Sequence, residues 1–594
     1  MKLVLIFLII NFLLIINCEN LIKVLDVRLA QTHIIPIEGK TWNLKNKTQH
    51  MSIIGNRRAL LLASFEDLNK SYYVSIWLDN KIIGSLELKD PSQLPQTEDN
   101  GERYSTKHHS VLLPKEWIRP NMKIKFTLTE SKDNSSLNID SSNFFYPDVS
   151  QDYTLKMWTL PFYLFGANDT NTQPFSVTNG IGSEITKELM ERWSCSDIIA
   201  VNHPIQRIDW PYLVMEPRNG NPAMLITNSD QKKDGYAIMN GVLNILTEIR
   251  EAFGESTSSI QIYSPLLHLG ANGKYTNPGG GLGGGSRGTG DHKYTFTFFH
   301  EQGHAMGLPH AGEAFAAGSY PYVNGSLLGS EWGYDANHNE LLGTFIPPTS
   351  DQFKNCRRNS VFDSKGRCVK QSVMQGGAGD YSSKYRYSMF ADFEMTTIQN
   401  YFKNSIYYDQ TKGTYKKWND TSKSYFEYIP STKNNGLWGL DDGTPIERDI
   451  EVYTILFTYS TVGPKELSQI YPILKSSKGN LMKRYDPTNK NDMKLITPGS
   501  GSWYCFASGC DYTVRVTFDD DSLEHILLRQ GKRKYWNPMG DFKENLYNAT
   551  SSNSFILRGI NVKATKSIKK VELLETLMAW KGISNATVLV SKDF

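Results

Sequence analysis

Short apolar runs that alternate with polar residues fill the chain from about residue 19 to residue 150. The runs KVLDVRLAQTHIIPI, RRALLLASF, YYVSIWLDNKIIGSLEL and KIKFTLTE are separated by segments rich in turn-forming residues. Alternation with a period of two is the pattern of a strand that buries one face. The sequence therefore predicts a β-rich, sandwich-like module over residues 19–150.

Helical periodicity begins after this module. SEITKELMERW (183–193) is short and amphipathic, and DGYAIMNGVLNILTEIREAFG (234–254) is a longer amphipathic segment that ends at Gly254, a natural helix terminus. One stripe of the longer segment carries Ile238, Val242, Ile245 and Ile249. Strand-like pieces, DIIAV and PYLVM, lie between the two segments. Strands that alternate with helices predict an α/β domain, which we place at residues 151–410.

The last third of the chain returns to strand patterning. DIEVYTILFTYST, YTVRVTF, HILLRQ and SFILRGINVKAT predict a second β-rich module over residues 430–594, whereas residues 311–400 read as loop-rich and irregular. The predicted fold class is therefore multidomain α+β, with a central domain flanked by β-rich modules.

A histidine-rich segment, FFHEQGHAMGLPHAGE, follows an apolar run directly. On an α-helix, His300 and His304 share one face, and Glu301 lies on the neighbouring flank. Gly307 supplies the permissive backbone that ends the helix and turns His310 back towards the first two rings. Three imidazole nitrogens with an open fourth position form the donor set of a catalytic zinc site. Three surface histidines on an amphipathic helix are the alternative, but that interpretation leaves the spacing unexplained.

The pattern H-E-x-x-H-x-x-G-x-x-H is typical of metzincin-type zinc proteases. It predicts that His300, His304 and His310 bind one Zn²⁺ ion and that Glu301 is the catalytic base. The predicted reaction is hydrolysis of a peptide bond by a zinc-bound water, from which Glu301 takes a proton that it later passes to the departing amine.

Composition and charge narrow the class of protein. The chain has 594 residues, enough for three or four domains, and is 39% hydrophobic and 21% charged. Its 64 basic and 61 acidic residues leave a net charge of +3, which gives no indication of a nucleic-acid or membrane partner. Nothing in the sequence determines the oligomeric state.

The first residues, MKLVLIFLIINFLLIINCEN, have the basic start and apolar core of a secretory signal peptide. We predict a signal peptide at residues 1–18 with cleavage near Cys18. An uncleaved anchor is the alternative, but the apolar run is shorter than the roughly 20 residues that a span needs. The mature protein is therefore predicted to be soluble and secreted, with no stable membrane insertion.

Five cysteines remain after that cleavage. In an oxidising environment the close pairs Cys356/Cys368 and Cys505/Cys510 are predicted to form local disulfides, and Cys195 to be buried as a small apolar side chain. Eight N-glycosylation sequons are compatible with secretion but are about what chance would supply, and they begin at Asn46, Asn69, Asn134, Asn168, Asn324, Asn419, Asn548 and Asn585.

A glycine-rich stretch, NPGGGLGGGSRGTGDHKYTFTFF, precedes the histidines. It lacks the Lys-Ser/Thr pair of a P-loop and the βαβ context of a dinucleotide site, so a phosphate-binding role is disfavoured. We expect a mixture of flexible loop and close-approaching backbone along the edge of an active-site cleft.

The sequence resembles the M66 (StcE-like) zinc metallopeptidases, and more closely the secreted amoebal members called dictomalleins. HEQGHAMGLPH has the family's H-E-x-G-H-x-x-G-x-x-H form, and EWGYD and SVMQGG follow in the family's order. GGGLGGG and the N-terminal AQTHIIPIEGK with RRALLLASF are also similar, so the resemblance covers about residues 25–410. It implies a metzincin-type catalytic domain that cleaves extracellular glycoproteins, mucin-like ones among them.

The resemblance also implies that Met374 is the methionine of the Met-turn, which packs beneath the zinc site. Met389, in RYSMF, is the competing candidate, because spacing alone does not decide between them. Gly376 stands where some metzincins carry a tyrosine, and Tyr385 and Tyr387 lie further along without a reason to prefer either.

Other polar residues have structural interpretations as strong as functional ones. We expect His292 and His338 to be surface or turn histidines, and the pair His108-His109 to need no metal. Glu313 is either an exposed glutamate or an acceptor that tethers a ligand histidine. Asp291 is a candidate cap for the zinc helix.

The sequence thus predicts a secreted zinc-dependent endopeptidase acting on a protein or glycoprotein substrate. The alternative is a secreted glycoprotein- or glycan-binding adhesin whose metalloprotease-like domain does not cleave. A binding module has no need of Glu301, so the intact motif favours the enzyme.

Overall fold

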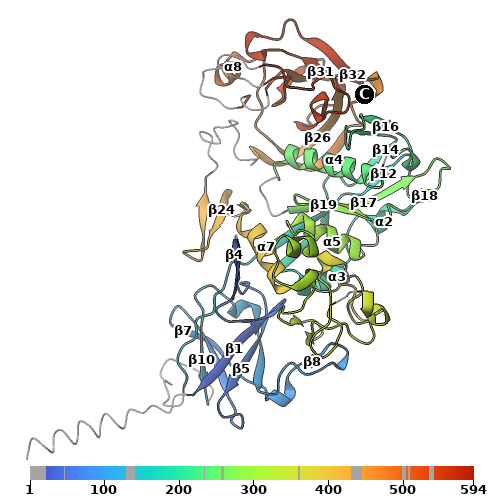
Figure 1. Cartoon of the computed structure of the whole chain (residues 1–594). Coiled ribbons are helices and arrows are strands. Elements are labelled where there is room, and N and C mark those ends of the chain that lie inside the picture. The colour runs from blue at the N-terminus through green and yellow to red at the C-terminus, as the bar shows by residue number, and fades with distance from the viewer. Residues whose placement is uncertain are drawn as a thin grey trace, which may run out of the picture.

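The computed structural model describes residues 22–594 except residues 46, 129–140, 233, 256–259, 359–360, 430–444, 498–503, 506–508 and 534–540. The predicted signal peptide, with Cys18, lies outside the described residues. The chain is a multidomain α+β protein, stacked as an N-terminal β region, a central region with helices, and a C-terminal β region (Figure 1). The domain boundaries proposed above stay predictions.

The N-terminal region contains two sheets that face each other. One has the order β2-β1-β5-β9 and the other the order β10-β6-β7. Their bounds are β1 (Val24–Ala30), β2 (Ile34–Pro36), β5 (Ala59–Phe65), β6 (Tyr73–Leu78), β7 (Lys81–Glu87), β9 (His108–Leu113) and β10 (Lys123–Thr127). Alternate residues such as Leu61, Ala63, Val74 and Ile124 point into one apolar core, because side chains alternate between the faces of a strand. A hairpin of β3 (Lys40–Leu44) and β4 (Lys47–Met51) completes this region.

The central sheet is built around one long strand, β17 (Ile260–Leu269). Its first half pairs in parallel with β11 (Thr154–Thr159) and its second half with β12 (Phe162–Leu164). The glycine-rich stretch forms β20 (Arg287–Gly290), parallel to β17, and β19 (Leu282–Gly284), antiparallel to β20. The outer strands β13 (Asp197–Asn202) and β14 (Ile208–Trp210) continue the parallel pairing.

Helices cover both faces of this sheet. α4 (Ala237–Phe253) shares an apolar cluster with Ile262, whereas the neighbouring Tyr263 stacks edge-on against Phe298 of α5 (Phe296–Ala305). Since adjacent residues of a strand face opposite sides, α4 and α5 lie on opposite faces. The predicted apolar stripe of α4 is buried and Gly254 ends the helix with φ 70°, as expected. The shorter predicted helix is also confirmed, as α3 (Ser183–Arg192).

The C-terminal region again consists of two facing sheets, with orders β27-β26-β30 and β29-β28-β31-β32. Their bounds are β26 (Glu447–Ser460), β27 (Leu474–Leu481), β28 (Tyr512–Phe518), β29 (Leu523–Leu527), β30 (Phe555–Lys563), β31 (Ile568–Glu575) and β32 (Thr587–Asp593). The strands predicted here are confirmed. This region rests on α4, since Val452 and Leu456 of β26 join the α4 cluster.

The stretch predicted to be irregular contains more regular structure than expected. α7 (Asp392–Lys403) is a helix of twelve residues, and α6 (Ala311–Ala316) is a short one. Most of α7 is buried, and its buried residues include the polar side chains of Asp392, Glu394, Thr396 and Gln399. The polar letters of DFEMTTIQNYFK therefore do not mark an exposed face, which is the signal that makes a helix recognisable from periodicity. A three-stranded meander follows, formed by β23 (Tyr407–Asp409), β24 (Thr414–Asn419) and β25 (Ser424–Tyr428), where no strand was predicted.

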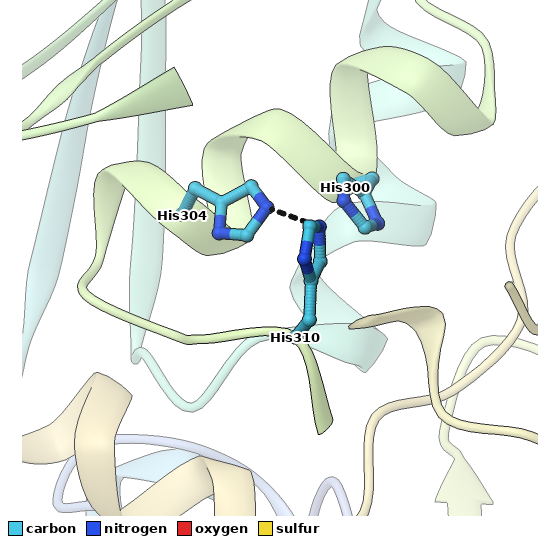
Figure 2. A group of neighbouring side chains, drawn as sticks. All are labelled: His300, His304 and His310. Atoms are coloured by element: carbon cyan, nitrogen blue, oxygen red, sulfur yellow. Dashed lines mark hydrogen bonds between the residues drawn. The ribbon is translucent and has the colours of Figure 1, made fainter. Parts of the chain in front are cut away.

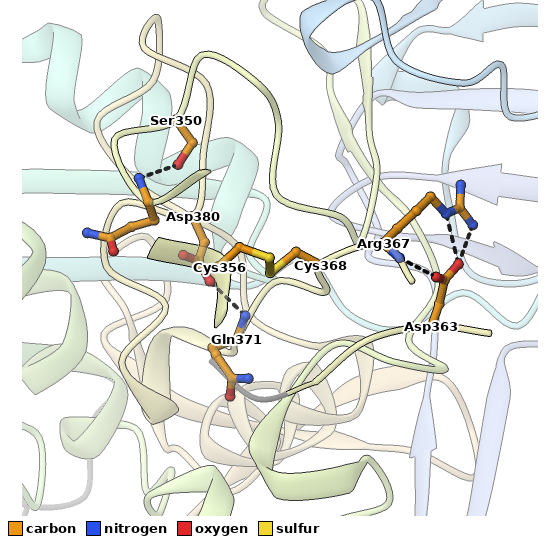
Figure 3. The surroundings of a disulfide bond; sticks show 8 residues. Ser350, Cys356, Asp363, Arg367, Cys368, Gln371 and Asp380 are labelled. Atoms are coloured by element: carbon orange, nitrogen blue, oxygen red, sulfur yellow. Dashed lines mark hydrogen bonds and ion pairs between the residues drawn. A yellow bond between two sulfur atoms is a disulfide. The ribbon is translucent and has the colours of Figure 1, made fainter. Parts of the chain in front are cut away.

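Both predicted disulfides are present. Cys356 is bonded to Cys368 and Cys505 to Cys510, while Cys195 is free and buried. Near the first disulfide, the Asp363 carboxylate accepts the backbone N–H of Arg367 at 2.7 Å, and that of Asp380 accepts the backbone N–H of Gln371 at 2.8 Å (Figure 3). These bonds fix the approach of the chain to residues 372–376.

Within the described residues, no helix is both long enough and apolar enough to cross a bilayer.

Candidate metal centre

The helix that carries the first two histidines is defined at both ends. Thr295 is its N-cap, with a hydroxyl that accepts the backbone N–H of Thr297. The suggested cap, Asp291, was wrong: its carboxylate instead accepts the Thr295 hydroxyl at 2.8 Å. The helix stops because Gly307 adopts φ 92°, a conformation that glycine tolerates best, and the chain then turns back as expected.

The three histidines of the motif converge on one point (Figure 2). One ring nitrogen from each of His300, His304 and His310 lies within 4.8 Å of the others, and Nε2 of His304 is 3.2 Å from Nε2 of His310. Among the described residues, no other group of three histidine, cysteine or acidic side chains comes together in this way.

Backbone carbonyls orient two of the rings. Nδ1 of His300 donates to the Val373 carbonyl oxygen at 2.9 Å, and Nδ1 of His304 donates to the Leu308 carbonyl oxygen at 2.7 Å. Because a carbonyl only accepts, the proton of each neutral ring resides on Nδ1 and leaves an Nε2 lone pair for a metal. Burial lowers the pKa of His300 to about 4 and also lowers the pKa of His304, so both rings are neutral at pH 7.

Glu301 is buried beside the histidines, between α5 and the glycine-rich strand β19. It is 8% exposed, and burial raises the pKa of its carboxyl to about 7. A carboxyl with a pKa near neutrality both accepts and returns a proton readily.

The glycine-rich stretch brings backbone against the helix. A Cβ on Gly283 would lie 2.1 Å from the carbonyl oxygen of Glu301, and one on Gly281 would lie 2.5 Å from its Cγ. Only glycine fits there, which confirms the close-approach half of the expectation.

An open pocket of about 590 Å³ adjoins the histidines. Its lining is His300, His310, Gly312, Glu313, Ala316, Asn324, Met374, Gln375 and Gly376. Met374 is fully buried beneath α5, so close that a Cβ on Gly303 would lie 2.6 Å from its sulfur. Met389 instead packs near Gly333 of β21 (Gly333–Asp335). The structure thus brings Met374, and not Met389, to the histidines.

Other candidate residues point elsewhere. The hydroxyl of Tyr385 donates to Glu340, and that of Tyr387 donates to the Tyr294 carbonyl oxygen. His292 lies in a turn, as expected, but is buried and not at the surface. His338 is half-exposed, 3.1 Å from Asp335.

The structure also places the adjacent histidines His108 and His109, and Glu313. Nε2 of His108 is 3.0 Å from Asp26, and His109 is buried against Phe65. Glu313 is both an exposed glutamate and a neighbour of His310, with a carboxylate oxygen 3.5 Å from Nδ1.

Sequence reasoning missed the groups that hold the rings. The carbonyls of Leu308 and Val373 carry no side-chain signature, so no pattern of letters reveals them. Ser372 lies in the same turn as Val373, and its hydroxyl donates to the Glu394 carboxylate and accepts the Met374 backbone N–H. Glu394 lies in α7, so finding it from the sequence would have required predicting that helix correctly.

Comparison with known proteins gives consistent matches. The model of the family described as Peptidase M66 matches residues 98–407. The chain is 72% identical to Dictomallein-3 of Dictyostelium discoideum over 598 residues, covering 100% of both chains. It is 53% identical to Dictomallein-1 of the same organism, covering 97% of this chain and 96% of the relative. It is 39% identical to Dictomallein of Burkholderia pseudomallei (strain K96243), covering 95% of this chain and 82% of that protein.

Proposed function

Because the chain belongs to peptidase family M66, we propose that it is a secreted zinc-dependent endopeptidase that cleaves extracellular glycoproteins. Family membership gives a peptidase-type function and a protein substrate. The metal, the mechanism, the metzincin-type domain, secretion and the glycoprotein preference belong to the proposal. The convergence of His300, His304 and His310 is the observation that carries it.

The donor set fits zinc. Tetrahedral zinc with Zn–N bonds of about 2.0–2.1 Å places its nitrogen ligands about 3.3 Å apart. The 3.2 Å separation of the His304 and His310 Nε2 atoms is close to that value. The two rings make a hydrogen bond through these atoms (Figure 2), and a zinc ion would take the place of that bond by accepting a lone pair from each nitrogen. His300, His304 and His310 would therefore hold the ion, and Met374 would pack beneath it as the Met-turn methionine.

Zinc supplies a Lewis acid that makes water more acidic and polarises a peptide carbonyl. Glu301 acts as the base: a carboxylate oxygen takes a proton from the attacking water and returns it to the nitrogen of the departing amine. The buried position beside β19 keeps this carboxyl poorly solvated, so its proton affinity is higher than that of an exposed glutamate.

Three further observations support the remaining parts of the proposal. The predicted signal peptide and the two disulfides suit an oxidising extracellular compartment. The glycoprotein preference is taken from the family resemblance. The open pocket is lined partly by the polar side chains of Asn324, Gln375 and Glu313, and such a pocket admits a bulky polar group.

The test compares secreted wild type with Glu301→Gln, using Glu184→Gln as a matched exposed control on α3. Zinc content and cleavage of a mucin-type glycoprotein and its deglycosylated form would be measured. We expect about one zinc per chain in all three proteins. Cleavage by Glu301→Gln should fall by roughly 10²–10⁴-fold, while the control keeps wild-type activity.

The outcomes separate the parts of this proposal. Wild type without zinc would refute the three-histidine site. Zinc binding without cleavage of either substrate would favour the non-cleaving adhesin. Equal cleavage of both substrates would keep the peptidase but remove the glycoprotein preference.

A further inference from the structure

A tight turn of residues 372–376 contacts both segments that carry the histidines. Its Val373 carbonyl accepts the His300 ring N–H at 2.9 Å, and Met374 packs under the helix at Gly303. The Gln375 side-chain oxygen accepts the backbone N–H of Gly312, two residues after His310, at 2.6 Å. The position of this turn therefore helps to set the relative positions of His300 and His310.

Ser372 organises the turn from within. Its hydroxyl oxygen accepts the backbone N–H of Met374 at 3.0 Å, and its carbonyl accepts those of Gln375 at 2.8 Å and Gly377 at 3.0 Å. The same hydroxyl donates to the Glu394 carboxylate, whose two oxygens lie 2.7 and 2.8 Å away. Ser372 thus connects the turn to helix α7.

Burying Glu394 at this position costs free energy. It is 3% exposed, and no lysine, arginine or histidine among the described residues forms an ion pair with it. Its carboxylate also accepts the backbone N–H of Ala391 at 2.6 Å, at the start of α7. A buried carboxyl without a cation costs free energy that an apolar residue would avoid. Its hydrogen bonds to the turn indicate what the residue does in return.

α7 itself is held from the opposite side by the N-terminal region. The Gln399 amide bonds both the N–H and the carbonyl of Ser52, at 3.1 and 2.9 Å, and Lys40 contacts the buried Asp392 at 2.6 Å. Because these contacts hold the helix at its first residue and again at Gln399, Glu394 presents its carboxylate to Ser372 at a fixed position.

We propose that Glu394, acting through Ser372, is a positioning residue that holds the 372–376 turn in the geometry in which His300 binds the metal. This inference rests on the proposed function, since it takes the three histidines to be zinc ligands. Glu394 touches neither the rings nor the substrate pocket, so its effect reaches the metal only through the turn.

The experiment uses the full-length secreted chain and measures zinc affinity by competition with a chelator, together with the visible absorption of the cobalt(II)-substituted protein. Glu394→Leu removes the acceptor at similar volume, and Glu394→Gln keeps one acceptor oxygen. Ser372→Ala removes the connecting hydroxyl. Glu191→Leu is the matched control, because Glu191 is equally buried and bonds Arg58 and the Ala336 N–H, but not the turn.

We expect Glu394→Leu and Ser372→Ala each to weaken zinc binding about tenfold, the lower end of the range for groups that support metal ligands. Their cobalt spectra should change, because ligand geometry sets the absorption. Glu394→Gln should recover part of the affinity. The Glu394→Leu/Ser372→Ala double variant should bind zinc about as tightly as the single variant with the lower zinc affinity, because both substitutions remove the same Ser372–Glu394 connection. Glu191→Leu should lose stability yet keep zinc affinity within about twofold.

Three results would overturn the inference. A folded Glu394→Leu protein with wild-type zinc affinity and cobalt spectrum removes it while leaving the proposed function intact. Should Glu394→Leu fail to fold, the same wild-type behaviour in Ser372→Ala removes it equally. A wild type that binds no zinc refutes the proposed function and this inference with it.

Discussion

The two β regions attach to the central domain in different places, although each is a pair of facing sheets. The N-terminal region shares one apolar core with Phe298, Phe299 and Met374, the residues beneath the histidines. The C-terminal region packs on α4, on the other face of the sheet from α5 (Figure 1). The first is therefore part of the support of the candidate site, whereas the second is separated from it by a sheet and a helix.

The ion pairs, hydrogen bonds and ring contacts of the two β regions also reach different parts of the central domain. From the N-terminal side, Lys40 reaches Asp392 at the start of α7, and a ring nitrogen of His33 contacts the Phe390 carbonyl at 3.1 Å. From the C-terminal side, Arg558 pairs with Glu248 of α4 at 2.8 Å, and Tyr471 stacks on Trp210 with ring centres 4.1 Å apart. Among these four contacts, the two from the N-terminal side reach α7 and Phe390, which precedes it, whereas the two from the C-terminal side reach α4 and β14.

The largest expected effect comes from breaking one ion pair on each side. Lys40→Met leaves the fully buried Asp392 carboxylate without its cation and should cost about 3–5 kcal/mol of unfolding free energy. Arg558→Met should cost less, about 1–3 kcal/mol, because the arginine is 36% exposed and water replaces part of the contact. Denaturant unfolding measures both values.

Zinc affinity of the same two variants, measured while both are folded, sharpens the comparison. Lys40→Met should bind zinc more weakly because α7 loses an anchor, and Arg558→Met should bind like wild type. Equal losses of zinc affinity in the two variants would contradict the division between the interfaces.

The second effect is a pH dependence of the unfolding free energy that comes from Glu394 of α7, the helix that the N-terminal region contacts. Burial raises the pKa of Glu394 to about 7, from 4.5 for an exposed glutamate. For a raised carboxyl pKa, the stability contribution is complete below pH 4.5 and is lost as the pH rises through 7. From pH 5 to 8 the wild type should therefore lose about 2.5 kcal/mol that Glu394→Gln does not lose. Unfolding free energies of both proteins across this range test it; parallel curves would exclude it.

The smallest effect comes from a matched pair of amides. Gln399→Ala removes the bonds to Ser52, and Asn480→Ala removes the bonds from its amide to the Phe253 carbonyl at 2.9 Å and to Glu255 at 3.0 Å. Each leaves buried groups unpaired, so each should cost about 1–3 kcal/mol. Peptidase activity at a temperature where both are folded should fall only in Gln399→Ala.

Sequence patterns predicted an element correctly where the same kind of buried environment recurs at regular positions along that element. The runs of β5 and β26 and the stripe of α4 place apolar residues at buried positions, so the letters alone predicted them. α7 was missed because several of its buried positions carry polar residues, among them Asp392, Glu394 and Gln399. The meander was missed as well: β23 lies at the end of the predicted central domain, and β24 and β25 lie between it and the predicted C-terminal module.

The features of the candidate site also separate into those that the sequence predicted and those that it did not. The sequence by itself determined the identity and spacing of His300, Glu301, His304 and His310, because a helix of 3.6 residues per turn and one glycine fix their approach. Only the tertiary structure decided which carbonyls orient the rings, that Met374 and not Met389 lies beneath them, and that Glu394 holds the intervening turn. The His300–Val373 contact joins residues 73 apart in the chain and the Ser372–Glu394 contact residues 22 apart, and no local periodicity records them. They arise from the packing of α5 against α7 and the N-terminal region, which depends on the whole fold.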